Sequence, residues 1–137
     1  MSAGDLDFDI LVPEISALAR RASEAILEIY ATDFAVESKA DHTPVTAADT
    51  AAEAIITQGL RTITPDVPVV AEEAAAAGRI PDVSAGVFWL VDPLDGTREF
   101  LNRNGEFTVN IGLIVDGTPV LGVIQIPTLN ETFVGSV

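Results

Sequence analysis

Cysteine is absent from the 137 residues, and histidine occurs once. Without cysteine the chain has no disulfide, no thiolate zinc site and no cysteine nucleophile. The single histidine, His42, lies in a polar, turn-rich segment, where a surface position is a simpler interpretation than acid–base catalysis. Chemistry that depends on sulfur is therefore excluded, and a reducing compartment suits the composition.

Positive charge is also scarce, with 7 Lys and Arg against 21 Asp and Glu, for a formal net charge of -14. Such a chain repels nucleic-acid polymers and anionic lipid surfaces at long range, so neither is expected as a partner. A small phosphorylated substrate is an anion too, and binding one requires bound cations or local amide dipoles. The balance of charge points toward a metal, although acidity also simply keeps a surface solvated.

Long hydrophobic runs are missing as well. The longest apolar stretch, Ala85 to Val91 with glycine allowed, is far below the roughly 20 residues that span a bilayer. The start of the chain lacks the basic segment and apolar core of a secretory signal. We therefore expect a cytoplasmic protein with no membrane span, and at this length one domain covering residues 1–137.

The first half has the spacing of helices. Apolar residues recur every three or four positions from Ile10 to Tyr30, which predicts one long amphipathic helix. Pro44 disfavours helix just before it, and Thr46 to Asp49 fits a capping box that opens a second helix ending near Ile63. The residues expected to face inward on this helix are Ala51, Ala54, Ile55, Leu60 and Ile63.

Beyond Pro65 the pattern changes to strands. Val67 to Val70 and Val87 to Val91 are apolar runs that read as strands buried on both faces, each followed by carboxylates. Three further strands form an antiparallel meander joined by short turns: Phe107 to Val115, Pro119 to Ile126 and Glu131 to Val137. The predicted fold class is α+β, a layered α-β architecture with two N-terminal helices on a large, mainly antiparallel sheet.

The last predicted strand reaches the final residue without a turn or cap after it. Domains seldom end on an exposed edge strand, because such an edge pairs with other chains. This pattern predicts an N-terminal domain that is truncated at its C-terminus.

The segment Asp92-Pro93-Leu94-Asp95-Gly96-Thr97 carries the clearest chemical pattern. Magnesium prefers oxygen ligands, and a proline that ends the strand would force a turn between the two aspartates. The next residues, Thr97 to Leu101, read as the start of a helix whose first amides favour a phosphate. A plain turn explains the same residue types, whereas an EF-hand loop is excluded by its missing acidic positions.

Three ordered blocks together resemble the inositol monophosphatase superfamily of metal-dependent phosphatases. They are Pro44 to Asp49, Glu72-Glu73, and Trp89 to Phe100, the last being diagnostic by itself. Arg98 to Leu101 and Asn104 to Asn110 look closer to the 3'(2'),5'-bisphosphate nucleotidases of the CysQ type than to inositol monophosphatases. That subfamily removes a phosphate from adenosine 3',5'-bisphosphate, a by-product of sulfate assimilation. The resemblance implies the N-terminal half of the sugar-phosphatase fold.

The resemblance also implies roles for individual residues. Glu72 and the Leu94 carbonyl would bind one Mg²⁺, Asp95 a second, and Asp92 would bridge both. Thr97 would orient the attacking water, and Asp49 would hold the threonine hydroxyl as a relay. The amides of Gly96 and Thr97 would hold phosphate oxygens, so that the substrate site comprises Glu72, Leu94, Asp95, Gly96 and Thr97.

One departure from the family pattern matters. The second half of family members supplies a further metal-binding aspartate within a Trp-Asp segment, and here the one tryptophan, Trp89, is followed by Leu90. We therefore expect an incomplete site. Two alternatives stay open: a phosphatase for inositol or sugar monophosphates, and a non-catalytic assembly module that pairs with itself or with a complementary C-terminal half.

Overall fold

The computed structural model describes residues 6–31, 43–71, 74–75, 78–101 and 104–136. Two long helices come first, α1 (Phe8–Tyr30) and α2 (Thr43–Ile63). A five-stranded sheet follows, with one short helix, α4 (Thr97–Leu101), between its second and third strands. The strands are β1 (Val69–Ala71), β2 (Val87–Asp95), β3 (Thr108–Val115), β4 (Thr118–Ile126) and β5 (Glu131–Ser136).

The sheet has the spatial order β1-β2-β3-β4-β5, so every neighbour in space is also a neighbour in sequence. The pair β1 and β2 is parallel, and the other pairs are antiparallel. Residues Asp116 and Gly117, which connect β3 to β4, both have positive φ, as a tight hairpin turn requires. The predicted meander, and with it the α+β class, is confirmed.

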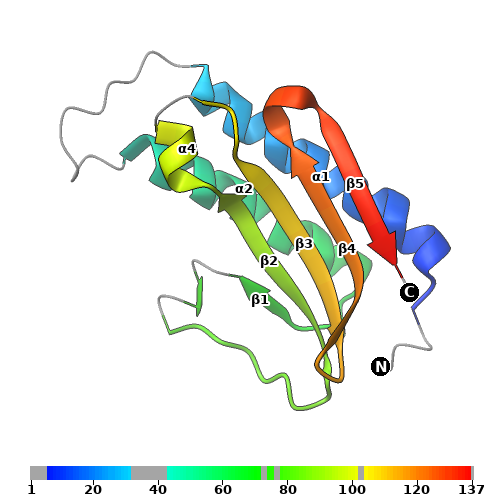
Figure 1. The fold of residues 1–137 in the computed structure, drawn as a ribbon. Helices are drawn as coiled ribbons and strands as arrows, with labels where there is room; N and C mark the ends of the chain where they lie inside the picture. Colours follow the sequence, from blue (N-terminus) through cyan, green and yellow to red (C-terminus); the bar gives the residue numbers. More distant parts are fainter. Residues whose placement is uncertain (1–5, 32–42, 72–73, 76–77, 102–103, 137) are drawn as a thin grey trace.

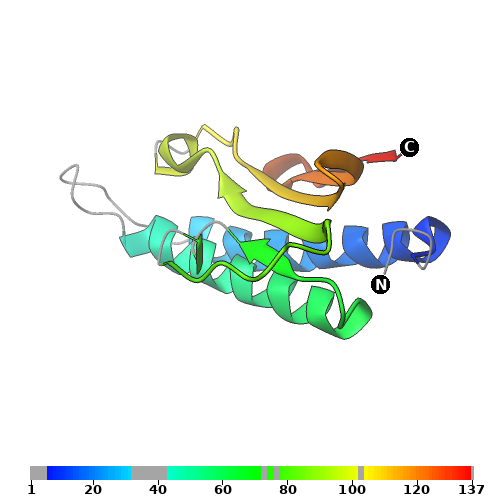
Figure 2. The same ribbon diagram turned by 90° about the horizontal axis from the view of Figure 1, so that it is seen from below.

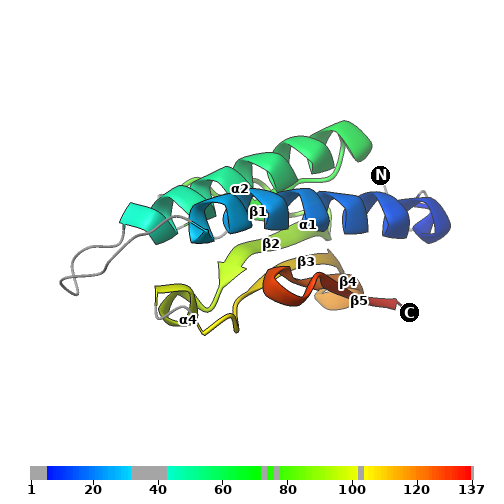
Figure 3. The same ribbon diagram turned by 90° about the horizontal axis from the view of Figure 1, so that it is seen from above.

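Both long helices cover one face of the sheet (Figures 2 and 3). Helix α1 contacts β3, β4 and β5, while α2 contacts β1 and β2. Between the layers lies a core in which Ile15, Ile56 and Trp89 are fully buried. The indole Nε1 of Trp89 donates a hydrogen bond of 2.9 Å to Thr64 Oγ1, which ties β2 to the residue after α2.

The second helix differs from the prediction at its start and in its buried face. It begins at Thr43, so Thr46 lies within the helix and is not its cap. Proline is tolerated in a first turn, whose amides have no intrahelical partner, so Pro44 does not delay the helix. The buried face is Ala48, Ala52, Ile56 and Leu60, and the predicted inward residue Ala54 is exposed.

The prediction that β2 is buried on both faces is wrong. Val87, Trp89 and Val91 point into the core, whereas the Leu90 side chain is 49% exposed. Successive side chains of a strand point to opposite faces, and only one face of this sheet is covered by described helices.

Candidate active site

The two aspartates of the diagnostic segment lie at the C-terminal end of β2, which runs to Asp95. Pro93 does not end the strand, contrary to the sequence prediction. The register between β2 and β3 is irregular between Asp92 and Asp95, so the strand passes a residue that has no amide hydrogen to donate. Asp92 is partly buried, Leu94 is buried, and Asp95 is exposed.

The parallel pair β1 and β2 brings the C-terminal end of β1 beside the residues that precede Asp92. Ala71, the last residue of β1, pairs with Val91, the residue before Asp92. Parallel strands place their carboxyl ends together, which is the arrangement that the sequence pattern required. Glu72, the next residue of the chain, and Glu73 lie outside the described residues.

Asp49 lies in the first half of α2. Its side chain is only 9% exposed, and α2 contacts both β2 and α4. The Oδ1 atoms of Asp49 and Asp92 are shielded from solvent. Both residues also interact with other groups of the protein. Burying a carboxylate is costly unless cations or donors compensate it, so these two acids suit a site for positive charge.

Gly96 joins β2 to α4 in a conformation that other residues rarely adopt, with φ of 98°. A Cβ atom here would lie 3.1 Å from the Glu106 carbonyl oxygen and 3.2 Å from Phe107 Cα. The Gly96 carbonyl accepts the Phe100 amide at 2.9 Å, which starts α4 as predicted. Thr97, the first residue of that helix, is exposed beside this turn.

An aromatic cluster that the sequence pattern did not reveal holds α4 in place. The ring of Phe100 lies 5.3 Å from those of Tyr30 and Phe107, and Tyr30 and Phe107 are 4.9 Å apart between centroids. Phe100 and Phe107 are fully buried. The cluster joins the end of α1 to the helix that follows the aspartates, and only the tertiary fold brings these rings together.

The second signature segment, Asn104 to Asn110, has structural roles. Asn104 Oδ1 accepts the Glu106 amide at 3.0 Å, which makes a local turn. The Gly105 carbonyl accepts a 2.9 Å hydrogen bond from Thr128 Oγ1, on the 3₁₀ turn after β4. Asn110 pairs with Asp92 across β2 and β3, a neighbour that sequence reasoning did not identify.

Within the described part of the chain, no group of three or more His, Cys, Asp or Glu side chains is placed to hold a metal ion. Glu72 lies outside the described residues. The oxygen donors that are described, from Asp92, Asp95 and the Leu94 carbonyl, are the kind that Mg²⁺ prefers. The ligand set and the roles of Thr97 and Asp49 remain predictions.

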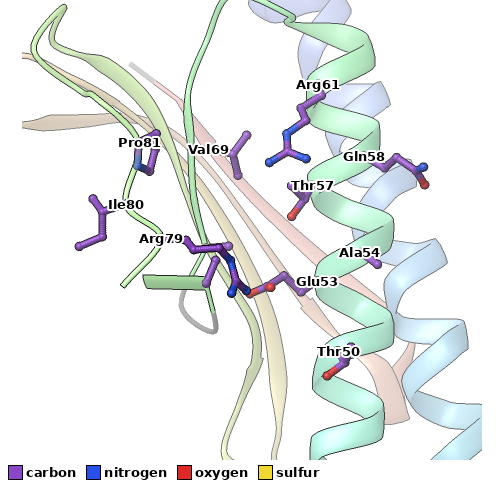
Figure 4. Close-up of a pocket in the computed structure, with 12 residues that line it drawn as sticks. Thr50, Glu53, Ala54, Thr57, Gln58, Arg61, Val69, Arg79, Ile80 and Pro81 are labelled. Atoms are coloured by element: carbon purple, nitrogen blue, oxygen red, sulfur yellow. The ribbon is translucent and has the colours of Figure 1, made fainter. Parts of the chain in front are cut away.

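A hollow of about 660 Å³ lies between α2 and the connection that follows β1 (Figure 4). Glu53, Thr57 and Arg61 line it from α2, and Arg79 lines it from the opposite wall. Thr57 Oγ1 is buried and has no hydrogen-bond partner among the described residues. None of the predicted site residues that the structure describes lines this hollow.

The described helices include none that is both long and apolar enough to cross a membrane.

The sequence is similar to known bacterial nucleotidases. It is 51% identical over 125 residues to the 3'(2'),5'-bisphosphate nucleotidase CysQ of Escherichia coli K12, which covers 90% of this chain and 50% of that protein. With the Haemophilus influenzae CysQ the identity is 36%, covering 90% and 46%. The chain therefore spans about half the length of the curated relatives that it matches.

The fold is similar to solved structures of the same kind. A CysQ from Bacteroides thetaiotaomicron matches with a TM-score of 0.74 and 38% identity, over 91% of this chain and 46% of that one. An inositol monophosphatase from Zymomonas mobilis matches with a TM-score of 0.78 and 32% identity, over 96% and 49%. The model of the inositol monophosphatase family matches residues 10–137. This chain belongs to the inositol monophosphatase family.

Proposed function

We propose that this chain carries the N-terminal part of a magnesium-dependent phosphomonoesterase that removes the 3'-phosphate of adenosine 3',5'-bisphosphate. The observation that carries the proposal is its identity to nucleotidases. Among solved structures it is 38% identical to the Bacteroides thetaiotaomicron CysQ, against 26 to 32% for inositol monophosphatases that also share its fold. The proposal assigns the activity of those nucleotidases to this chain, which spans about half of their length.

The described geometry is compatible with this reaction. Asp92 and Asp95 end a strand, the end of β1 lies beside it, and the Asp49 carboxylate is buried on a contacting helix. Glu72, Asp92, Asp95 and the Leu94 carbonyl would hold two Mg²⁺ ions. Such a pair of ions activates a water on one side of phosphorus and stabilises the leaving oxygen on the other.

The chain's own groups would align the reaction. The Thr97 hydroxyl would donate its hydrogen bond to the Asp49 carboxylate, which would fix the hydroxyl's direction, and it would accept a hydrogen bond from the attacking water. The backbone amides of Gly96 and Thr97 would donate to phosphate oxygens. The aromatic cluster of Tyr30, Phe100 and Phe107 would keep the turn at Gly96 from moving relative to the sheet.

A substrate comparison tests the proposal. The protein to assay is a chimera in which this chain is joined to the part of the E. coli K12 CysQ that the match does not cover. With Mg²⁺ we expect phosphate release from adenosine 3',5'-bisphosphate at least about tenfold faster, as kcat/KM, than from inositol 1-phosphate. The E. coli protein itself is the positive control. Preference for inositol 1-phosphate would favour the monophosphatase alternative, which the shared fold also supports.

A further inference from the structure

The hollow between α2 and the connection that follows β1 has the size of a small-molecule site (Figure 4). Its volume of about 660 Å³ lies within the range of roughly 300–1,000 Å³ that is usual for ligand pockets. Val69 and Ala71 line it from β1, and they pair with Trp89 and Val91, whose side chains are buried in the core. The hollow therefore lies on the helix side of the sheet.

The two walls of the hollow are held by ordinary secondary structure. Glu53, Thr57 and Arg61 follow one another at a spacing of four residues, so they lie on one face of α2. On the opposite wall the Arg79 amide donates a hydrogen bond of 2.8 Å to the Ala74 carbonyl, which closes a turn. The polar side chains of the hollow thus come from two segments whose backbones are fixed locally.

The lining carries positive charge in a chain that has little of it. Arg61 and Arg79 are two of only 7 basic residues in a protein with a net charge of -14, and Glu53 is the one acid among the described residues that line the hollow. In Figure 4 the side chains of Glu53 and Arg79 point toward one another, and Arg61 points into the hollow. Arg61 is therefore placed to hold an anion. The acidic remainder of the protein repels multiply charged ligands, which favours a ligand with a single negative charge.

Thr57 lies one turn before Arg61 and supplies a hydroxyl that the protein leaves unused. Threonine hydroxyls near this position donate to the carbonyl four residues earlier, as Thr62 does to Gln58 and Thr64 does to Leu60. Thr57 Oγ1 is shielded from solvent and has no hydrogen-bond partner among the described residues. Such a hydroxyl costs stability. Because it has no bond to lose, rotation about χ1 can turn it toward an acceptor bound in the hollow.

The rest of the described lining is mostly apolar. The Ile80 side chain is 65% exposed, and Pro81 follows it at the edge of the hollow. Val69 lines the hollow from the strand. Ligand sites commonly combine such apolar walls with a few polar groups that fix orientation.

We propose that this hollow binds a small organic monocarboxylate. The carboxylate pairs with the Arg61 guanidinium, whose planar fork matches it, and accepts a hydrogen bond from the Thr57 hydroxyl. The apolar body of the ligand rests against Val69, Ile80 and Pro81. A phosphate monoester carries nearly two negative charges, which the single excess positive charge of the described lining suits less well. The inference does not depend on the proposed substrate or on Mg²⁺.

Titration of the ¹⁵N-labelled chain with benzoate, in the absence of Mg²⁺, tests the proposal. We expect saturable shifts of the amide resonances of Thr57, Arg61 and Arg79, with a Kd on the order of 1 mM. Three further probes separate the parts of the ligand. Benzamide has the ring without the charge, acetate has the charge without the ring, and inorganic phosphate is the alternative anion. Each should bind at least about tenfold more weakly than benzoate.

Variants of the lining identify the groups that bind. Arg61→Gln should weaken benzoate binding about tenfold, as the loss of one charge-assisted hydrogen bond predicts. Thr57→Val keeps the shape of the side chain and should weaken binding about fivefold, while the urea midpoint stays the same or rises because an unpaired hydroxyl is removed. Arg20→Gln, at an exposed arginine of α1 that does not line the hollow, is the matched control and should change neither quantity.

The absence of saturable shifts at these amides would overturn the proposal. So would an affinity that neither Arg61→Gln nor Thr57→Val changes, or phosphate binding as tight as that of benzoate. Binding by this chain that is lost in the chimera defined above would show that the rest of a family chain covers the hollow, and would overturn the proposal equally. If benzoate binds as expected and the chimera is inactive on the bisphosphate, the proposed function alone fails.

Discussion

At the scale of single residues, Asp92 is the group on which most of the proposed chemistry depends. It is partly buried, it pairs with Asn110, and it follows the residue that β1 contacts. Replacing one carboxylate oxygen by an amide removes the negative charge that a divalent cation needs while keeping the shape of the side chain.

We predict that Asp92→Asn abolishes Mg²⁺ binding to the chain in calorimetric titration. The matched control is Asp66→Asn, an exposed aspartate in the turn after α2, which should leave the titration unchanged. Urea unfolding of both variants checks that the fold is retained. Mg²⁺ binding by Asp92→Asn with the same affinity as the unsubstituted chain would remove Asp92 from the ligand set.

At the scale of elements, a buried hydrogen bond links β2 to the residue that follows α2. Trp89 and Thr64 are 0% and 3% exposed, and the Thr64 hydroxyl also donates to the Leu60 carbonyl at 2.9 Å. Because Trp89 lies on the strand that carries Asp92, this contact helps to fix the site against α2.

Thr64→Val should destabilise the chain by about 1–3 kcal/mol, since it leaves a buried indole N–H without its acceptor. Thr62→Val is the control, because the Thr62 hydroxyl makes a similar bond of 3.0 Å to the Gln58 carbonyl on the exposed surface. Urea unfolding followed by the fluorescence of the one tryptophan measures both. Equal, small losses of unfolding free energy in the two variants would show that the indole N–H finds another acceptor.

At the scale of the whole molecule, the chain contains one closed core and one open sheet face. The core explains how 137 residues form a stable layer of helices on a sheet. The described residues place both long helices on one face of the sheet, and the chain spans about half the length of its curated relatives.

We expect this chain alone, supplied with Mg²⁺, to hydrolyse adenosine 3',5'-bisphosphate far below the rate of about 10 s⁻¹ that is typical of enzymes. The chimera should recover activity, because the resemblance to the family implies a further metal-binding aspartate in the part of those proteins that this chain does not match. Phosphate release by the two proteins at equal concentration is the measurement. A chain that is as fast as the chimera would contradict the proposal that its site is incomplete.

The sequence by itself determined the order and type of the main elements and the family. Helical spacing from Ile10 to Tyr30 and the apolar runs after Pro65 reflect local periodicity, which burial against any partner layer would produce. The segment from Asp92 to Thr97 was identifiable for a similar reason, since Asp, Pro and Gly at fixed positions impose local geometry.

The tertiary structure decided what depends on neighbours distant in sequence. The buried face of α2 was predicted only in part: Leu60 is buried and Ile55 and Ile63 pack against the core, whereas Ala54 is exposed. The burial of β2 on both faces and the end of that strand at Pro93 were predicted wrongly. Each depends on packing or register across the sheet. The ring cluster of Tyr30, Phe100 and Phe107 arises only when separate segments are aligned, because no local pattern records which residues will meet.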